Sequence, residues 1–229
     1  MPSRIAPALV VTIALVSCGA PAATPSTPTA TVSATSAATS TAIATATTLP
    51  AGARRFAIVP ERSVATIRVR EQVAAIPAPG DAVLTTRAFT GAVVLLPDGG
   101  FASGSSFAAD LDALKSDEPL RDEWIKFNTL NTRVYPRAEF TLARVSGVPM
   151  PIATQGEWAA TLEGTMRIHG VERPVAWPVQ VTRSTGEVRV QGATAFKFGD
   201  YGMAVPANRL ILSVVDDVRL EIDLVAREP

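Results

Sequence analysis

Three places in the sequence carry residues that can do chemistry. His169 is the one histidine of the chain, and it lies in the stretch IHGV, where a turn is predicted. A histidine can act as a general base or bind a metal. Asp216 and Asp217 are adjacent carboxylates, and Cys18 is the one thiol. Hydrolysis, metal binding and covalent attachment at the thiol are therefore the chemistries to weigh.

The spacing of these residues argues against catalysis. A nucleophilic triad needs a serine or cysteine beside the histidine, and the sequence has no G-x-S-x-G elbow and no phosphate-binding loop. One histidine and one cysteine also exclude a zinc site built from several such ligands. Asp216 and Asp217 would point to opposite faces of a strand, so we expect an exposed turn or bulge there. We predict a protein that is not an enzyme and holds no metal or cofactor, with His169 as a hydrogen-bonded turn residue.

Cys18 ends a segment with the layout of an export signal. Arg4 gives a positive start, and the apolar stretch 5–16 that follows is too short to span a membrane. The ending LVSC at 15–18 resembles a bacterial lipobox, in which the cysteine receives a lipid before cleavage. We predict a lipoprotein signal peptide over 1–18, a membrane anchor on Cys18, and export to the periplasmic or extracellular face of the cell envelope. The alternative is an ordinary signal with an incidental cysteine.

The next segment, 19–53, consists almost wholly of Ala, Thr, Ser and Pro and has no charge. Such a composition cannot bury enough apolar surface to offset chain entropy, so we expect a disordered tether. The folded domain is then expected over 54–229. The chain carries 21 basic and 21 acidic residues, and this balance gives no basic face for nucleic acid.

The region 54–229 is dominated by apolar residues at every second position, the pattern of strands with one buried face. One segment differs: PLRDEWIKFNTL at 119–130 places Leu120, Trp124 and Phe127 at helical spacing. Ser116 or Asp117 could cap this helix, and the pair at 121–122 reads as a helix-start pair or a contact with the strands. About eight strands and one amphipathic helix exclude a doubly wound sheet. They favour an all-β fold, an up-and-down antiparallel barrel. The alternating stretches are 64–69, 89–96, 107–111, 138–142, 158–168, 175–181, 188–198 and 218–224.

The periodicity alone leaves open whether the barrel is filled or hollow, because eight strands allow either. The inward positions include the small residues Ala109, Ala160, Gly164 and Gly192 among large ones. These could be gaps around a ligand, or they could fill a tapering barrel.

Three motifs carry a family resemblance. LEGTMRIHGVERPVAWPV at 162–179, RDEWIKFNTLNTRVYPRAEF at 121–140 and FKFGDYGM at 196–203 occur in one order. They resemble the YceI-like family of polyisoprenoid-binding proteins over essentially all of 54–229. Trp124 and Tyr201 depart from the family pattern, where many relatives carry a histidine and a phenylalanine. The resemblance implies a lipocalin-like barrel that encloses a long isoprenoid chain and performs no chemistry on it.

On this resemblance we expect an isoprenoid quinone, a quinone precursor or another polyprenyl lipid as the ligand, held for storage, shielding or transfer at the envelope. Two alternatives remain: a structural or adhesive surface lipoprotein with a filled barrel, and a hydrolase using His169. The sequence gives no indication of the oligomeric state. The expected lipid-binding residues are Leu111, Phe140, Leu162, Met166, Ile168, Trp177, Val179, Phe196, Phe198, Leu220 and Ile222.

Overall fold

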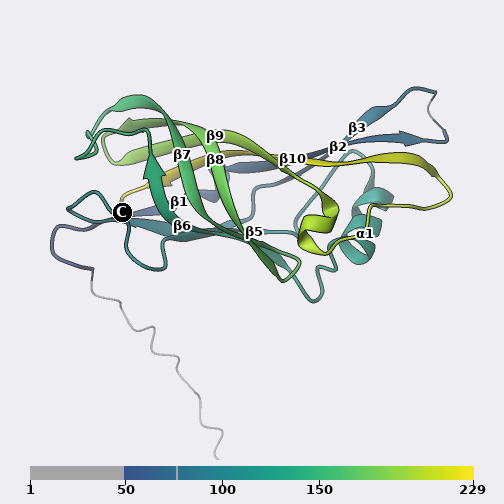
Figure 1. Ribbon diagram of the computed structural model, residues 1–229, viewed down its shortest axis with the longest axis horizontal. Coiled ribbons are helices and arrows are strands. Elements are labelled where there is room, and N and C mark those ends of the chain that lie inside the picture. The colour runs from purple at the N-terminus through teal and green to yellow at the C-terminus, as the bar shows by residue number, and fades with distance from the viewer. Residues whose placement is uncertain (1–48, 76) are drawn as a thin grey trace, which may run out of the picture. The chain divides into compact units, whose positions relative to one another are not determined.

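Alternating apolar and polar residues build ten antiparallel strands in the part of the chain that the computed structural model describes, residues 49–75 and 77–229 (Figure 1). The strands are β1 (Arg54–Ile58), β2 (Val64–Val73), β3 (Gly80–Thr86), β4 (Phe89–Leu95), β5 (Ser106–Asp110), β6 (Arg137–Ser146), β7 (Gly156–Ile168), β8 (Val171–Ser184), β9 (Glu187–Phe196) and β10 (Ile211–Arg227). The predicted signal peptide 1–18, its Cys18 and the first thirty residues of the predicted tether, 19–48, lie outside the described residues.

Eight of the strands close into a ring. The sheet order is β1-β4-β5-β6-β7-β8-β9-β10-β2-β3, and β1 also pairs with β10. β2 and β3 extend the ladder of β1 and β4 with a register shift of two residues: Ala57 pairs with Ala92, whereas Ala65, eight residues on, pairs with Thr86, six residues back. A short 3₁₀ turn, η1 (Pro60–Arg62), interrupts the hairpin between its two halves. The antiparallel barrel of about eight strands predicted from the sequence is confirmed.

The outer wall carries charge, and the inner wall is apolar. Along β7 the residues of one parity are buried or half-buried from Trp158 to Ile168, while the other parity is mostly more exposed. Arg167 lies directly opposite Glu139 across the β6–β7 register and forms an ion pair with it at 2.6 Å. Oppositely charged cross-strand neighbours stabilise a sheet pair. Such pairs place the charged side chains of both signs on the solvent side of the wall and leave the inner side to apolar residues.

The helix α1 (Pro119–Asn128) forms where the sequence predicts it, but its cap and its buried face differ from the expectation. Glu118 is the N-cap, and its carboxylate accepts the backbone N–H of Leu120 at 3.3 Å. Leu120 is 79% exposed, and the ring of Phe127 lies under the guanidinium of Arg133 rather than in the core. The buried helix residues include Asp122, which accepts the hydroxyl of Ser116 at 2.6 Å.

Two local features of the second half bear on the site. β10 has a register shift between Val214 and Val218, so the predicted bulge at Asp216 and Asp217 is confirmed. The alternation predicted through Phe198 ends earlier, because β9 stops at Phe196 and a 3₁₀ turn, η2 (Phe198–Tyr201), begins. Among residues 49–75 and 77–229, no helix is long and apolar enough to cross a membrane.

Candidate functional site: an apolar cavity inside the barrel

The barrel is hollow over the half that contains β2, β3 and α1. This main cavity has a volume of about 700 Å³. Its walls come from β2, β3 and the first part of β10 on one side, and from β5 to β9 on the other, with α1 at its mouth. A volume of this size lies within the range of ligand sites, about 300–1,000 Å³.

Most of the residues expected from the sequence lie around this cavity. Leu162 does not: it borders a second, smaller cavity farther from the mouth. Val179 is buried but borders neither cavity, because its side chain packs over Gly192 of the adjacent strand β9. The expected residues that line the main cavity are Leu111, Phe140, Met166, Ile168, Trp177, Phe196, Phe198, Leu220 and Ile222.

Sequence reasoning missed one wall of the main cavity. Ala82 and Leu84 of β3 line it and are 3% and 2% exposed, yet the stretch GDAVLTT was not assigned as a strand. Ile67 and Val69 of β2 and Phe89 of β4 complete this side. The sequence carries little signal for this strand: Ala82, Leu84 and Thr86 are buried, but Val83 between them is apolar as well, so apolar and polar residues do not alternate.

The sequence left open whether the small inward residues form gaps around a ligand, and two of them, Gly164 and Gly192, do not. A Cβ on Gly164 would lie 2.2 Å from the backbone oxygen of Thr141 and 2.8 Å from the ring of Phe140. A Cβ on Gly192 would lie 2.4 Å from the backbone oxygen of Pro178. These glycines let neighbouring strands approach closely. Of the four small residues considered, Ala109 borders the main cavity.

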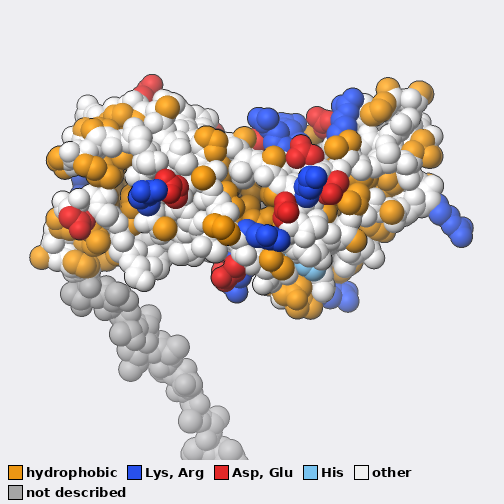
Figure 2. All heavy atoms as spheres, viewed as in Figure 1, with side chains coloured by type: hydrophobic (Ala, Val, Ile, Leu, Met, Phe, Trp, Pro, Cys, Tyr) orange, Lys and Arg blue, Asp and Glu red, His pale blue; other side chains and the backbone are white. Residues whose placement is uncertain are grey.

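The mouth of the main cavity combines an ion pair with an apolar rim. Arg121 of α1 reaches Glu71 of β2 at 3.0 Å, and both side chains are largely buried. This contact ties the helix to the barrel. Leu120 and Leu210 line the mouth and are 79% and 72% exposed. Figure 2 shows hydrophobic side chains gathered at the right-hand end of the domain, where β2 and β3 protrude.

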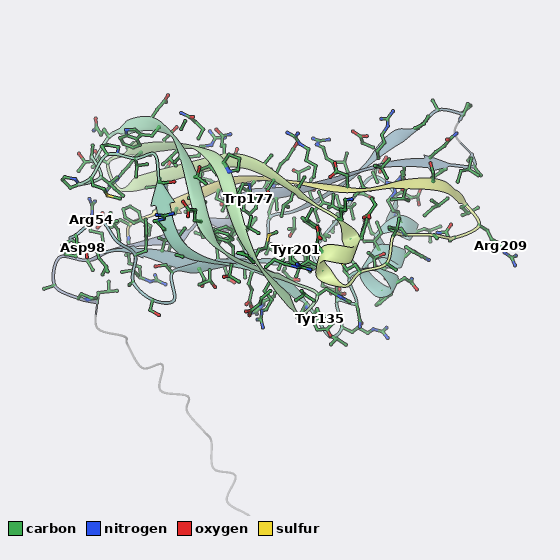
Figure 3. The ribbon with its side chains drawn as sticks, in the orientation of Figure 1. Arg54, Asp98, Tyr135, Trp177, Tyr201 and Arg209 are labelled. Carbon is green, nitrogen blue, oxygen red and sulfur yellow. The ribbon has the colours of Figure 1, made fainter. Side chains whose placement is uncertain are left out.

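Aromatic side chains form the floor of the main cavity. Phe107 stacks on Phe140 with ring centroids 5.4 Å apart, and Phe140 meets Trp177 edge-on at 5.9 Å. Trp177 is 1% exposed and lies near the middle of the domain, between the labelled Arg54 and Arg209 (Figure 3). Within the described residues, its indole N–H is buried without a hydrogen-bond partner.

His169 lies in the turn between β7 and β8, as predicted, with a positive φ of 52°. Its Nδ1 is 3.3 Å from the backbone oxygen of Tyr201, and its ring meets Tyr135 edge-on. Burial raises the pKa of the Tyr201 phenol to about 12, so the phenol stays protonated even at pH values near 10. Across residues 49–75 and 77–229, no three His, Cys, Asp or Glu side chains cluster as a metal site would need. The mostly apolar lining of the main cavity suits binding of an apolar molecule.

The comparisons with known proteins agree with this geometry. A family model described as YceI-like domain matches residues 56–226. A polyisoprenoid binding domain from Saccharophagus degradans, implicated in plant cell wall breakdown, superposes with a TM-score of 0.59 at 13% identity, covering 76% of this chain and 98% of that one. BcnA from Burkholderia cenocepacia gives 0.54 at 15% identity, covering 73% and 98%. These structural likenesses show a shared fold. No curated protein sequence matches the chain.

Proposed function

The chain belongs to the YceI-like domain family, and from this premise we propose that it is a non-catalytic carrier whose main cavity binds a long isoprenoid lipid. The observation that carries the proposal is the apolar cavity of about 700 Å³. An isoprenoid chain offers only hydrocarbon, and the lining offers few polar atoms. At ~25 cal/mol per Å², burying 300–400 Å² of chain contributes roughly 8–10 kcal/mol before losses of motion are deducted.

The ligand enters with its polar head group at the mouth and its chain inside. Three of the four charged residues of the lining, Glu71, Glu118 and Arg121, lie at the mouth end, on β2 and around α1, and the fourth, Glu139 of β6, is paired with Arg167. An isoprenoid quinone, a quinone precursor or another polyprenyl lipid has this division between a polar head and an apolar chain. The Saccharophagus degradans domain is described as polyisoprenoid-binding, which supports the ligand class.

The role follows from the proposed anchor. An exported lipoprotein attached through Cys18 would store, shield or transfer its lipid at the cell envelope. The LVSC ending at 15–18, which resembles a lipobox, supports the anchor. Lipid chains on Cys18 would hold the protein at the membrane, because each buried CH₂ contributes about 0.8 kcal/mol. Replacement of Cys18 by serine is expected to release the protein into the soluble fraction or to leave it unprocessed. Normal processing with unchanged detergent partitioning would show that the anchor is elsewhere.

Organic extraction of the purified protein, followed by mass spectrometry, tests the ligand. The expected result is a prenyl lipid in stoichiometric amount. The structural alternative, a barrel filled by its own side chains, is poorly supported by a void of about 700 Å³. It would gain support if the extract contained no lipid and delipidated protein bound none.

A further inference from the structure

A second cavity of about 130 Å³ lies in the half of the barrel away from the mouth. Its walls come from β1, β4 and the opposite ends of the strands that enclose the main cavity. Nearly all of its lining is aliphatic or aromatic, with Arg183 as the one charged side chain. The guanidinium of Arg183 donates to the backbone oxygen of Ile152 at 3.3 Å and lies over the ring of Phe56. The second cavity therefore suits hydrocarbon.

The two cavities are stacked end to end along the barrel. On β6, Phe140 borders the main cavity and Leu142 borders the second. On β10, Ile222 borders the main cavity and Leu224 the second. Inward residues that are two apart on one strand thus face different cavities. The partition between them is about one layer of side chains thick.

Phe107 is the residue that lines both cavities. Its ring stacks on Phe140 at 5.4 Å and separates the two voids. Phe140 itself is held in place, because its ring packs into the space above Gly164. Phe107 comes from β5, a short strand of five residues, and has a void on each side of it. It is therefore the part of the partition with room to turn.

We propose that the second cavity is a subsite for the far end of a longer isoprenoid chain and that Phe107 sets the length of chain the protein accepts. This inference rests on the proposed function. The second cavity has about a fifth of the volume of the main one, 130 against 700 Å³. Joining them lengthens the accepted chain by about a fifth, which is one or two isoprene units for a chain that fills the main cavity. The chain end that reaches the second cavity is plain hydrocarbon, because Arg183 is already engaged.

The test uses delipidated protein and a series of polyprenols that differ by one isoprene unit. Binding is followed by the change in tryptophan emission, since Trp124 and Trp177 line the main cavity. Phe107→Ala is expected to move the optimum to longer polyprenols by one or two units. Phe107→Leu is expected to move it in the same direction by less, and it covers the case in which the alanine variant fails to fold.

Two control variants separate an opened partition from a merely loosened core. Phe101→Ala also removes a phenyl ring from the lining of the second cavity but leaves Phe107 in place. The optimal polyprenol length therefore stays that of the wild type. Ala226→Leu fills the second cavity, and combined with Phe107→Ala it restores the wild-type optimum. An unchanged optimum in the Phe107 variants, or equal weakening for every length, overturns the inference while the proposed function stands. A wild type that binds neither polyprenols nor isoprenoid quinones refutes the proposed function itself.

Discussion

Ala109→Trp should block lipid binding without unfolding the protein. Ala109 of β5 pairs with Ala138 of β6, and both line the main cavity. An indole at position 109 would occupy space that the ligand needs, and it would enter a void rather than a packed core. The matched control is Ala108→Trp, since residue 108 lies on the same strand with the opposite parity and borders neither cavity.

The size of the effect can be worked out from ligand linkage. A ligand present at 100 times its Kd stabilises the folded state by about 2.7 kcal/mol. For a domain of this size, 1 kcal/mol shifts Tm by roughly 2–4 °C. Lipid loading is therefore expected to raise the Tm of the wild type and of Ala108→Trp by about 5–10 °C. Ala109→Trp should show no such rise, while its Tm without lipid stays close to that of the delipidated wild type.

Thermal unfolding by circular dichroism, with and without added lipid, measures both quantities. The reasoning is refuted if Ala109→Trp still gains several degrees on loading. It is also refuted if the delipidated variant is destabilised by the roughly 1–3 kcal/mol typical of an overpacked core, because position 109 would then be packed against side chains.

Three further predictions concern charged and titratable groups. Arg121→Gln leaves Glu71 without its ion-pair partner. We expect the free energy of unfolding, measured in urea, to fall by about 1–2 kcal/mol, and lipid transfer to vesicles to become faster. Unchanged transfer would mean that this ion pair does not hold the mouth closed. The hydrogen bond from Arg189 keeps the pKa of Asp223 below its ordinary value of 3.8. The stability that the ionised Asp223 contributes is therefore present above pH 3.8 and is lost as the pH falls below that value. Asp223→Asn should flatten the acid limb of a plot of unfolding free energy against pH, and an unaltered limb would contradict this. Burial raises the pKa of Tyr201 from 10.0 to about 12. The stability that the protonated phenol contributes is therefore present below pH 10 and is lost as the pH rises towards 12. Phenolate absorbance should show one tyrosine that titrates late and that Tyr201→Phe removes, and persistence of this tyrosine in the variant would refute the assignment.

The sequence predicted the fold best where alternation is long and unbroken. β7 and β8 together span from Gly156 to Ser184, and their buried parity is the one that the sequence indicates. β1 and β3 were missed. β1 has five residues, and β3 follows a stretch rich in alanine and proline that reads as a loop. β1 and β2 form one arm of a long hairpin, which η1 interrupts, and β3 and β4 form the other arm, which breaks at residues 87–88. Such interruptions hide the continuity of a strand from any local pattern.

The helix shows a second limit of periodicity. Leu120, Trp124 and Phe127 share one helical face, yet Leu120 lies exposed at the cavity mouth and Phe127 packs against Arg133. The side of α1 towards the preceding segment is set instead by Asp122, whose carboxylate accepts two groups of Ser116. A buried carboxylate must be hydrogen-bonded, and this local requirement overrides the apolar stripe.

The position of empty space depends on cross-strand register, which no single strand encodes. Ala109 and Gly164 are both small and both inward, but Ala109 borders the main cavity while the space above Gly164 is taken by Phe140 and by the backbone of Thr141. Gly164 pairs with Leu142, next to a register shift in β6, and irregularities of this kind bend a strand and increase its twist. Substitution of Gly164 by leucine would therefore break the β6–β7 contact rather than fill a pocket. A residue suited to blocking the ligand is one beside a void, and the void exists only once the ring of strands has closed.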